Sequence, residues 1–211
     1  MPIEINSLED AAARLKEIAA STDKRVVIGI VGKPGAGKST LSEYLSKKIA
    51  FPEMSVLPMD GFHMSNKVLV ELGRLDRKGA EHTFDSHGFV SLLKRVREET
   101  QHPIYYPVFH REIEESIAGE GTVLPETRII LTEGNYLLYD KLGWEQVKDL
   151  LDESWVVTVN DDHRIARLID RHVKYGRTRE EARERSLGSD EINAQLIEST
   201  FPRADVIVNL A

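Results

Sequence analysis

The sequence predicts an α/β fold of three layers, in which helices cover both faces of a mainly parallel sheet of five strands. Short apolar, β-branched runs alternate with amphipathic helical stretches along the chain, which is typical of such a sheet. The chain has 211 residues, of which 41% are hydrophobic and 30% charged, enough for one full core. No repeat or linker divides it. Residues 1–211 are therefore expected to form a single domain.

Five apolar runs account for the strands, and six stretches with helical spacing account for the helices. The predicted strands are residues 25–32, 55–60, 128–132, 154–160 and 204–210. The predicted helices are residues 8–20, 39–50, 87–99, 144–152, 161–176 and 179–200. Residues 102–116 contain two prolines and are expected to be irregular or extended.

A glycine-rich loop joins the first predicted strand to the helix that follows it. Residues 32–39 read GKPGAGKS, which matches the phosphate-binding pattern G-x-x-x-x-G-K-[ST] in full. Its glycines allow backbone N–H groups to point at a phosphate, and the helix N-terminus adds partial positive charge. Lys38 is expected to reach the β- and γ-phosphates of ATP, and Ser39 to bind Mg²⁺. The predicted nucleotide-binding residues are Gly32, Lys33, Pro34, Gly35, Ala36, Gly37, Lys38, Ser39 and Thr40.

Two acidic residues lie where predicted strands end. Asp60 ends the second strand, and Glu133 directly follows the third. Because the C-terminal ends of parallel strands border the ligand crevice, both side chains are expected to face the phosphates. Asp60 can accept the proton of an acceptor hydroxyl or hold Mg²⁺, and Glu133 can orient the magnesium waters. The alternatives are a turn aspartate before Gly61 and a capping glutamate before Gly134.

Three arginines recur at helical spacing in the predicted helix at residues 161–176. Arg164, Arg167 and Arg171 fall three and four residues apart and share one face. They form either a solvated face that pairs with nearby aspartates, or a lid that brings guanidinium groups to the transferring phosphate. These residues alone support the two interpretations equally. Such a lid would span about residues 162–190.

The overall charge and the lack of cysteine exclude several classes of protein. A formal net charge of -7 argues against nucleic acid or an anionic membrane as the main partner, because both require a basic face. The absence of cysteine excludes disulfides, thiolate metal sites and a cysteine nucleophile. No signal peptide and no apolar stretch of bilayer-spanning length is visible, so a cytoplasmic location is expected.

Five segments resemble the group of P-loop kinases that contains phosphoribulokinase, uridine kinase and bacterial pantothenate kinase. They read GKPGAGKST, MDGFH, RKGAEHTFD, EGNYLL and RLIDRH, and the resemblance covers about residues 25–208. The nearest subgroup is often labelled nucleoside/nucleotide kinase-like or fructose-transport-system kinase. The resemblance implies a P-loop NTPase fold with a helical lid, Asp60 as catalytic base, Glu133 as the magnesium-binding acid, and Arg167 and Arg171 as lid arginines.

The resemblance also implies an acceptor site, built from inserts at about residues 61–90 and 103–120. The matching positions are His63, Lys78, Phe84, Asp85, His110, Arg111, Asn135 and Tyr136. One position departs from the subgroup, which usually has Pro-x-Phe-Asp-Arg where this chain has Pro107 to Arg111. His110 replaces the aspartate, so the name of the subgroup's acceptor does not transfer.

These features together favour a kinase that uses ATP and Mg²⁺ and phosphorylates a hydroxyl of a small molecule, of the nucleoside, pantothenate-like, sugar or sugar-acid class. Lys38, Asp60, Arg167 and Arg171 are the expected catalytic residues, and the metal is expected at Ser39, Glu133 and Asp60. The alternative is a switch that holds or hydrolyses the triphosphate without an acceptor, although the Asn-Lys-x-Asp guanine reader is absent. An ATPase that acts on nucleic acid is opposed by the net charge. A homodimer is left open.

Overall fold

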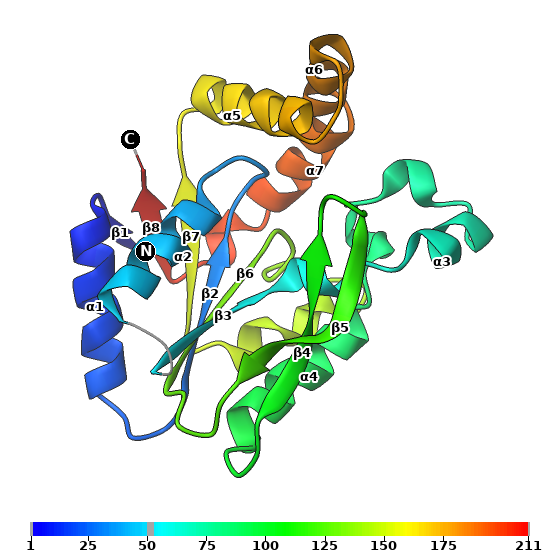
Figure 1. Ribbon diagram of the computed structural model, residues 1–211. Coiled ribbons are helices and arrows are strands. Elements are labelled where there is room, and N and C mark those ends of the chain that lie inside the picture. The colour runs from blue at the N-terminus through cyan, green and yellow to red at the C-terminus, as the bar shows by residue number, and fades with distance from the viewer. Residues whose placement is uncertain (1, 50–52, 211) are drawn as a thin grey trace.

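A computed structural model describes residues 2–49 and 53–210 (Figure 1). Its centre is a parallel sheet of six strands in the order β1 (Ile3–Ile5), β8 (Val206–Asn209), β7 (Glu153–Thr158), β2 (Val26–Val31), β6 (Ile129–Gly134) and β3 (Met54–Pro58). The predicted parallel α/β fold is confirmed, but the predicted number of five strands is wrong. Edge strand β1 has only three residues, too few to give a readable pattern.

Both faces of the sheet are covered, because the central strand β2 is buried along its whole length. Its alternate side chains enter two cores. Ile28 and Ile30 pack in the core beneath α1 (Leu8–Ala20) and α2 (Lys38–Lys48). Val27 and Val31 pack in a second core, with the apolar face of α4 (Ser86–Glu98). This is the three-layer arrangement expected from the sequence. Ala50, the last residue of the predicted helix at residues 39–50, lies outside the described residues.

Residues 144–152 do not form the predicted helix. They form two separate 3₁₀ turns, Trp144–Gln146 and Lys148–Leu150. Trp144 is fully buried, and its indole N–H donates to the carbonyl of Glu81 at 3.1 Å. The preceding Gly143 has a φ of 90°. This tertiary anchoring overrides the helical spacing of the segment.

Residues 102–116 are more regular than predicted. They contribute to an antiparallel hairpin of β4 (Ile104–His110) and β5 (Glu115–Val123), separate from the main sheet. The ladder is irregular between Tyr106 and Val108. The intervening residue is Pro107, which has no N–H to donate to a ladder. Figure 1 shows the hairpin on the same side of the molecule as the short helix α3 (Asn66–Glu71).

Three helices near the C-terminus form a separate layer above the C-terminal ends of the central strands (Figure 1). They are α5 (Asp161–Lys174), α6 (Arg179–Leu187) and α7 (Ser189–Glu198). Asn160 caps α5, and Thr178 and Glu181 form a capping box on α6. The predicted helix at residues 179–200 is interrupted at Gly188, between α6 and α7. Within residues 2–49 and 53–210, no helix is long and apolar enough to cross a lipid bilayer.

Candidate active site

The glycine-rich loop lies between the end of β2 and the start of α2, as the sequence predicts. Gly35 and Gly37 have φ angles of 83° and 98°, which glycine adopts without steric cost. A Cβ atom at Gly35 would also lie 2.7 Å from the carbonyl oxygen of Arg164 in α5. The loop is therefore shaped both by its own backbone and by close contact with the layer above it.

The Lys38 ammonium is surrounded by neutral acceptors. It donates to the carbonyl oxygens of Gly32 and Lys33 at 2.8 and 3.3 Å and to Oδ1 of Asn135 at 2.7 Å. Burial lowers the pKa of Lys38 to about 8, although the nearby carboxylates of Glu133 and Asp60 oppose the shift. A buried ammonium is stabilised most by an anionic partner, and phosphate oxygens are such partners.

Glu133 lies at the end of β6, where its backbone is the register partner of Ile30 in β2 and Pro58 in β3. Its carboxylate accepts hydrogen bonds from the hydroxyls of Ser39 at 3.3 Å and Ser42 at 3.0 Å. Burial raises its pKa. Carboxylate and hydroxyl oxygens are the donors that Mg²⁺ prefers. The Ser39 hydroxyl and the Glu133 carboxylate fit a magnesium ion that takes its remaining ligands from phosphates and water.

Asp60 lies two residues beyond the end of β3, in the 3₁₀ turn Met59–Phe62. One carboxylate oxygen accepts a hydrogen bond from Arg111 Nη2 at 3.0 Å. Burial opposes the ionisation of Asp60, but the surrounding positive charges outweigh it and hold its pKa below the ordinary value. These charges come from His63, Arg111, Lys38 and Arg171. Because burial also lowers the pKa of His63, its ring is mainly neutral near pH 7, and the lasting contribution is that of the lysine and arginines.

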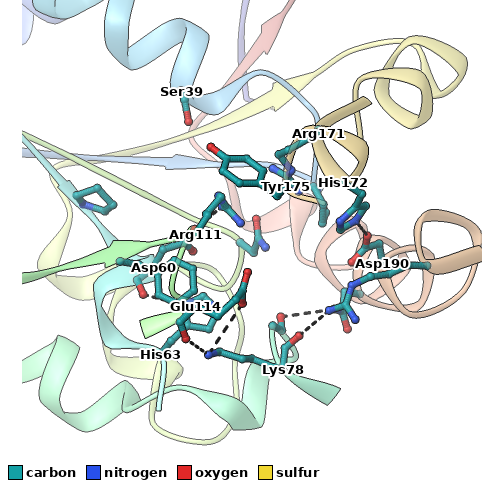
Figure 2. A pocket seen from close by; sticks show the side chains of 18 of the residues that line it. Ser39, Asp60, His63, Lys78, Arg111, Glu114, Arg171, His172, Tyr175 and Asp190 are labelled. Atoms are coloured by element: carbon teal, nitrogen blue, oxygen red, sulfur yellow. Dashed lines mark hydrogen bonds and ion pairs between the residues drawn. The ribbon is translucent and has the colours of Figure 1, made fainter. Parts of the chain in front are cut away.

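An aromatic shelf adjoins Asp60 on the side away from the glycine-rich loop. The imidazole of His63 lies between the rings of Phe84 and Phe109, with centroid distances of 4.0 and 4.4 Å. The Lys78 ammonium lies 5.3 Å from the centroid of Phe109. Figure 2 shows His63, Lys78 and Arg111 around one hollow. This arrangement offers an apolar surface edged by charges, which suits a small polar molecule.

The three arginines of α5 do not share one environment. Arg164 is fully buried, and its guanidinium donates to Asp161 and Glu191, each at 2.6 Å. Arg167 is exposed, and Arg171 is half-buried. Both line the cleft. Burial and the neighbouring Arg111 lower the pKa of Arg171, against the pull of Asp60. Helical spacing alone predicted that the three side chains share one face. Packing instead buries Arg164 against its carboxylate partners and leaves Arg167 and Arg171 facing the cleft.

A single cleft of about 850 Å³ joins the loop, the strand ends, the aromatic shelf and the lid helices. Most of the predicted site residues line it. They are Pro34, Gly35, Gly37, Lys38, Ser39, Thr40, Asp60, His63, Lys78, Phe84, Arg111, Glu133, Asn135, Arg167 and Arg171.

Six of the predicted site residues do not line the cleft. Gly32, Lys33 and Ala36 are buried in the loop itself. Asp85 caps α4 by accepting from the N–H of Gly88 at 2.8 Å, and His110 pairs with Glu120 at 2.6 Å on the hairpin. The hydroxyl of buried Tyr136 donates to the carbonyl of Gly79 at 2.7 Å. These last three contacts give each side chain a structural partner.

Sequence reasoning missed several residues that line the cleft from α3, the hairpin tip and the lid. They are Asn66, Glu112, Glu114, His172, Tyr175, Arg177, Arg185, Asp190 and Asn193. Of these, His172 and Asp190 form a hydrogen-bonded pair at 2.7 Å. The signal in the sequence was weak, because α6 carries charges on every side and the orientation of both α6 and α7 depends on packing.

A phosphate loop between a parallel strand and a helix, carboxylates at the next strand ends and an arginine-bearing helical layer above them together define a P-loop kinase. The chain belongs to the Phosphoribulokinase / Uridine kinase family, whose sequence profile matches residues 27–211. It is an ATP-dependent kinase of a small molecule.

Individual relatives agree with this assignment. A proposed uridine kinase of Schizosaccharomyces pombe is 34% identical over 97% of this chain and 91% of its own length. An ATP-dependent kinase-like protein of Aspergillus versicolor is 31% identical over 71% of this chain and 92% of its own length. The crystal structure of a proposed fructose transport system kinase from Silicibacter sp. TM1040 is 36% identical, with a TM-score of 0.82 over 95% of this chain and 98% of that one.

Proposed function

We propose that the protein transfers the γ-phosphate of ATP to a hydroxyl of a small acceptor, with Mg²⁺ as cofactor and Asp60 as general base. The observation that carries the proposal is the common cleft, in which Asp60 lies between the Lys38 end and the aromatic shelf. Residues 61–90 and 103–120 would supply the acceptor side, and residues 162–190 the lid. The names of the relatives mention different acceptors, so they do not identify the acceptor of this protein.

At the nucleotide end, the loop amides and Lys38 would bind the β- and γ-phosphates. Ser39 and Glu133 would hold Mg²⁺ directly or through water, and the metal would neutralise charge on the phosphate oxygens. In support, Lys38 already donates to three neutral oxygens that phosphate oxygens can replace. The Ser39 hydroxyl and the Glu133 carboxylate are 3.3 Å apart, close enough to share one small ion.

At the acceptor end, Asp60 would orient the hydroxyl and take its proton as the new bond to phosphorus forms. Its lowered pKa keeps it ionised at neutral pH, as a proton acceptor requires. Arg111 would fix the direction of the carboxylate through its 3.0 Å contact.

Above the phosphates, Arg167 and Arg171 would stabilise the charge that develops on the equatorial oxygens. Neither guanidinium has a carboxylate within 4.0 Å among the described residues. Both are therefore available to an anionic ligand in the cleft. Arg164 would instead hold the base of the lid against the loop, through its bonds to Asp161 and Glu191.

The test is acceptor-dependent release of ADP from Mg-ATP, measured by a coupled assay across nucleosides, sugars, polyols and hydroxy acids. The proposal predicts that at least one acceptor raises ADP release well above the rate with water, and that the acceptor gains one phosphate by mass spectrometry. Rapid ATP loss that no acceptor changes would instead favour the nucleotide-dependent switch.

A further inference from the structure

A second positively charged region lies in the cleft, remote from the glycine-rich loop. It is formed where the turn at residues 77–79 meets helices α6 and α7. Arg185 Nη2 donates to the carbonyl of Lys78 at 3.1 Å, and Asn193 Nδ2 donates to the carbonyl of Gly79 at 3.4 Å. We name the group of Lys78, Arg185 and Asn193 the cationic corner. The turn at residues 77–79 and helices α6 and α7 are more than a hundred residues apart in sequence, and only the fold brings them together.

The charges of the cationic corner are incompletely neutralised. The Lys78 side chain is 9% exposed, and its ammonium donates to Oδ1 of Asn66 at 2.7 Å and to the carbonyl of Glu114. The carboxylate of Glu114 is 4.0 Å away, too far for a hydrogen bond. One of the three ammonium hydrogens is therefore left for a ligand. Burial lowers the pKa of Lys78, and Glu114 and Glu115 oppose this only in part.

Arg185 is in a similar position. Its guanidinium contacts a neutral carbonyl, and no carboxylate of the described residues lies within 4.0 Å of it. Two of the acids that line the cleft are already paired with other side chains. Asp60 is paired with Arg111, and Asp190 with His172. The cleft is lined by seven lysines and arginines against five aspartates and glutamates, although the whole chain has a net charge of -7.

Asn193 contributes an uncharged contact that helps to build the corner. The residue is 6% exposed and lines the cleft, and its Oδ1 has no hydrogen-bond partner among the described residues. The contact of Nδ2 with Gly79 fixes which way the amide faces. The Asn193 amide therefore holds the turn at Gly79 against α7, and the ligand contacts of the corner come from Lys78 and Arg185.

The corner is separate from the residues proposed to bind phosphate. Figure 2 shows Ser39 and Lys78 at opposite ends of the view, with Asp60 and Arg111 between them. A nucleotide on the loop would use Lys38, Arg167 and Arg171. Lys78 and Arg185 would remain for the other reactant, whose hydroxyl would face Asp60.

We infer that the acceptor is a small hydroxy acid or a phosphorylated polyol, whose anionic group is bound by Lys78 and Arg185. This inference rests on the proposed function. In the reaction, the acceptor hydroxyl loses its proton to the Asp60 carboxylate while its oxygen bonds to the γ-phosphorus. The bond from that phosphorus to the β,γ-bridging oxygen breaks, and ADP leaves. The acidic group takes no part in these steps and acts by orientation and affinity.

The test compares related acceptors of which one member carries an anionic group and the other does not, with ADP release as the readout. The pairs are glycerate with glycerol, gluconate with glucose, and fructose 6-phosphate with fructose. The inference predicts that kcat/KM is at least about tenfold higher for the anionic member of a pair, because a charge-assisted contact to a desolvated anion is that strong. The first two pairs test a carboxylate, and the third tests a phosphate.

Variants then assign the effect to the corner. Arg185→Gln should raise KM for the anionic acceptor about tenfold to a hundredfold and change KM for ATP by less than about twofold. The matched control is Arg183→Gln, because Arg183 lies on the same helix but is exposed and does not line the cleft. It should change neither constant.

Three results would overturn the inference. The first is a neutral member that reacts as well as its anionic partner, and the second is an unchanged KM for the anionic acceptor in Arg185→Gln. These two leave the proposed kinase function in place. The third is ADP release that no acceptor of either kind stimulates, which removes the proposed function and the inference together.

Discussion

Arg111 and Asp60 join the hairpin to the turn after β3 through a 3.0 Å ion pair. Arg111 lies at the hairpin tip, 51 residues from Asp60 in sequence. Because the His63 ring is mainly neutral near pH 7, Arg111 is the first of the permanently charged groups that hold the pKa of Asp60 down. The hairpin therefore forms one wall of the cleft and also favours the ionised form of the proposed base.

Replacing Arg111 by glutamine should raise the pKa of Asp60. A carboxylate whose pKa is depressed is ionised above that pKa and loses activity as pH falls through it, so removing the positive charge moves this loss to higher pH. The acidic limb of the kcat/KM profile should shift upward by roughly one pH unit. Arg95→Gln, on the exposed face of α4, is the control and should leave the profile in place. An unshifted limb in Arg111→Gln would contradict this role.

Binding of Mg-ATP should be accompanied by proton uptake at Lys38. The pKa of Lys38 is lowered to about 8, so at about pH 8.5 much of the amine is neutral in the free protein. Phosphate oxygens favour the charged form and raise the pKa, so the amine takes up a proton on binding. Isothermal titration calorimetry in buffers with different ionisation enthalpies measures this uptake.

The comparison for that experiment is a pair of variants on α2. Lys38→Met should abolish the proton uptake and most of the thermal stabilisation by Mg-ATP. Lys47→Met changes an exposed lysine in the last turn of the same helix and should preserve both. Equal proton uptake in the wild type and in Lys38→Met would show that another group takes up the proton.

Arg164 and Arg167 should separate stability from activity. Arg164 is fully buried and bonded to Asp161 and Glu191. Its replacement by methionine should lower the free energy of unfolding by about 2 kcal/mol, less than for a wholly buried pair because both acids are partly exposed. Arg167→Met should change stability by less than about 0.5 kcal/mol but reduce kcat. Urea unfolding and steady-state kinetics on both variants test this, and the reverse pattern would contradict it.

Gly61 should be needed for the position of the hairpin. A Cβ atom there would overlap the carbonyl of Pro107 in β4. Gly61→Ala should therefore push the hairpin from the Asp60 turn, lower kcat/KM and cost about 1–3 kcal/mol of stability. Gly73→Ala is the comparison, because Gly73 has a φ of 65° but open space around it. It should cost about 1 kcal/mol through backbone strain alone and leave kcat/KM unchanged.

The parts of the site that sequence predicted are those encoded in short contiguous segments. The loop at residues 32–39 has its own pattern, and Asp60 and Glu133 are marked by the ends of apolar strands. The opposite wall depends on long-range packing. Arg185 reaches the cleft only because α6 packs against the turn at residues 77–79.

Local spacing also failed where tertiary contacts decide the outcome. The periodicity that placed Arg164 with Arg167 contains no information on which side chain meets Asp161 and Glu191. The same limit explains the missed hairpin, whose strands pair across a proline, and the 3₁₀ turns around buried Trp144. In each case the pattern identified the segment, and packing fixed its conformation.

The central claim is that Asp60 is the base of a phosphoryl transfer, and Asp60→Asn tests it most directly. Asparagine keeps the shape but cannot accept the proton, so acceptor-dependent ADP release should fall by at least about a hundredfold. Affinity for Mg-ATP, measured by calorimetry, should change by less than about threefold. Asp140→Asn, at an exposed acid outside the cleft, serves as control. Transfer that survives within a few-fold in Asp60→Asn would contradict the account.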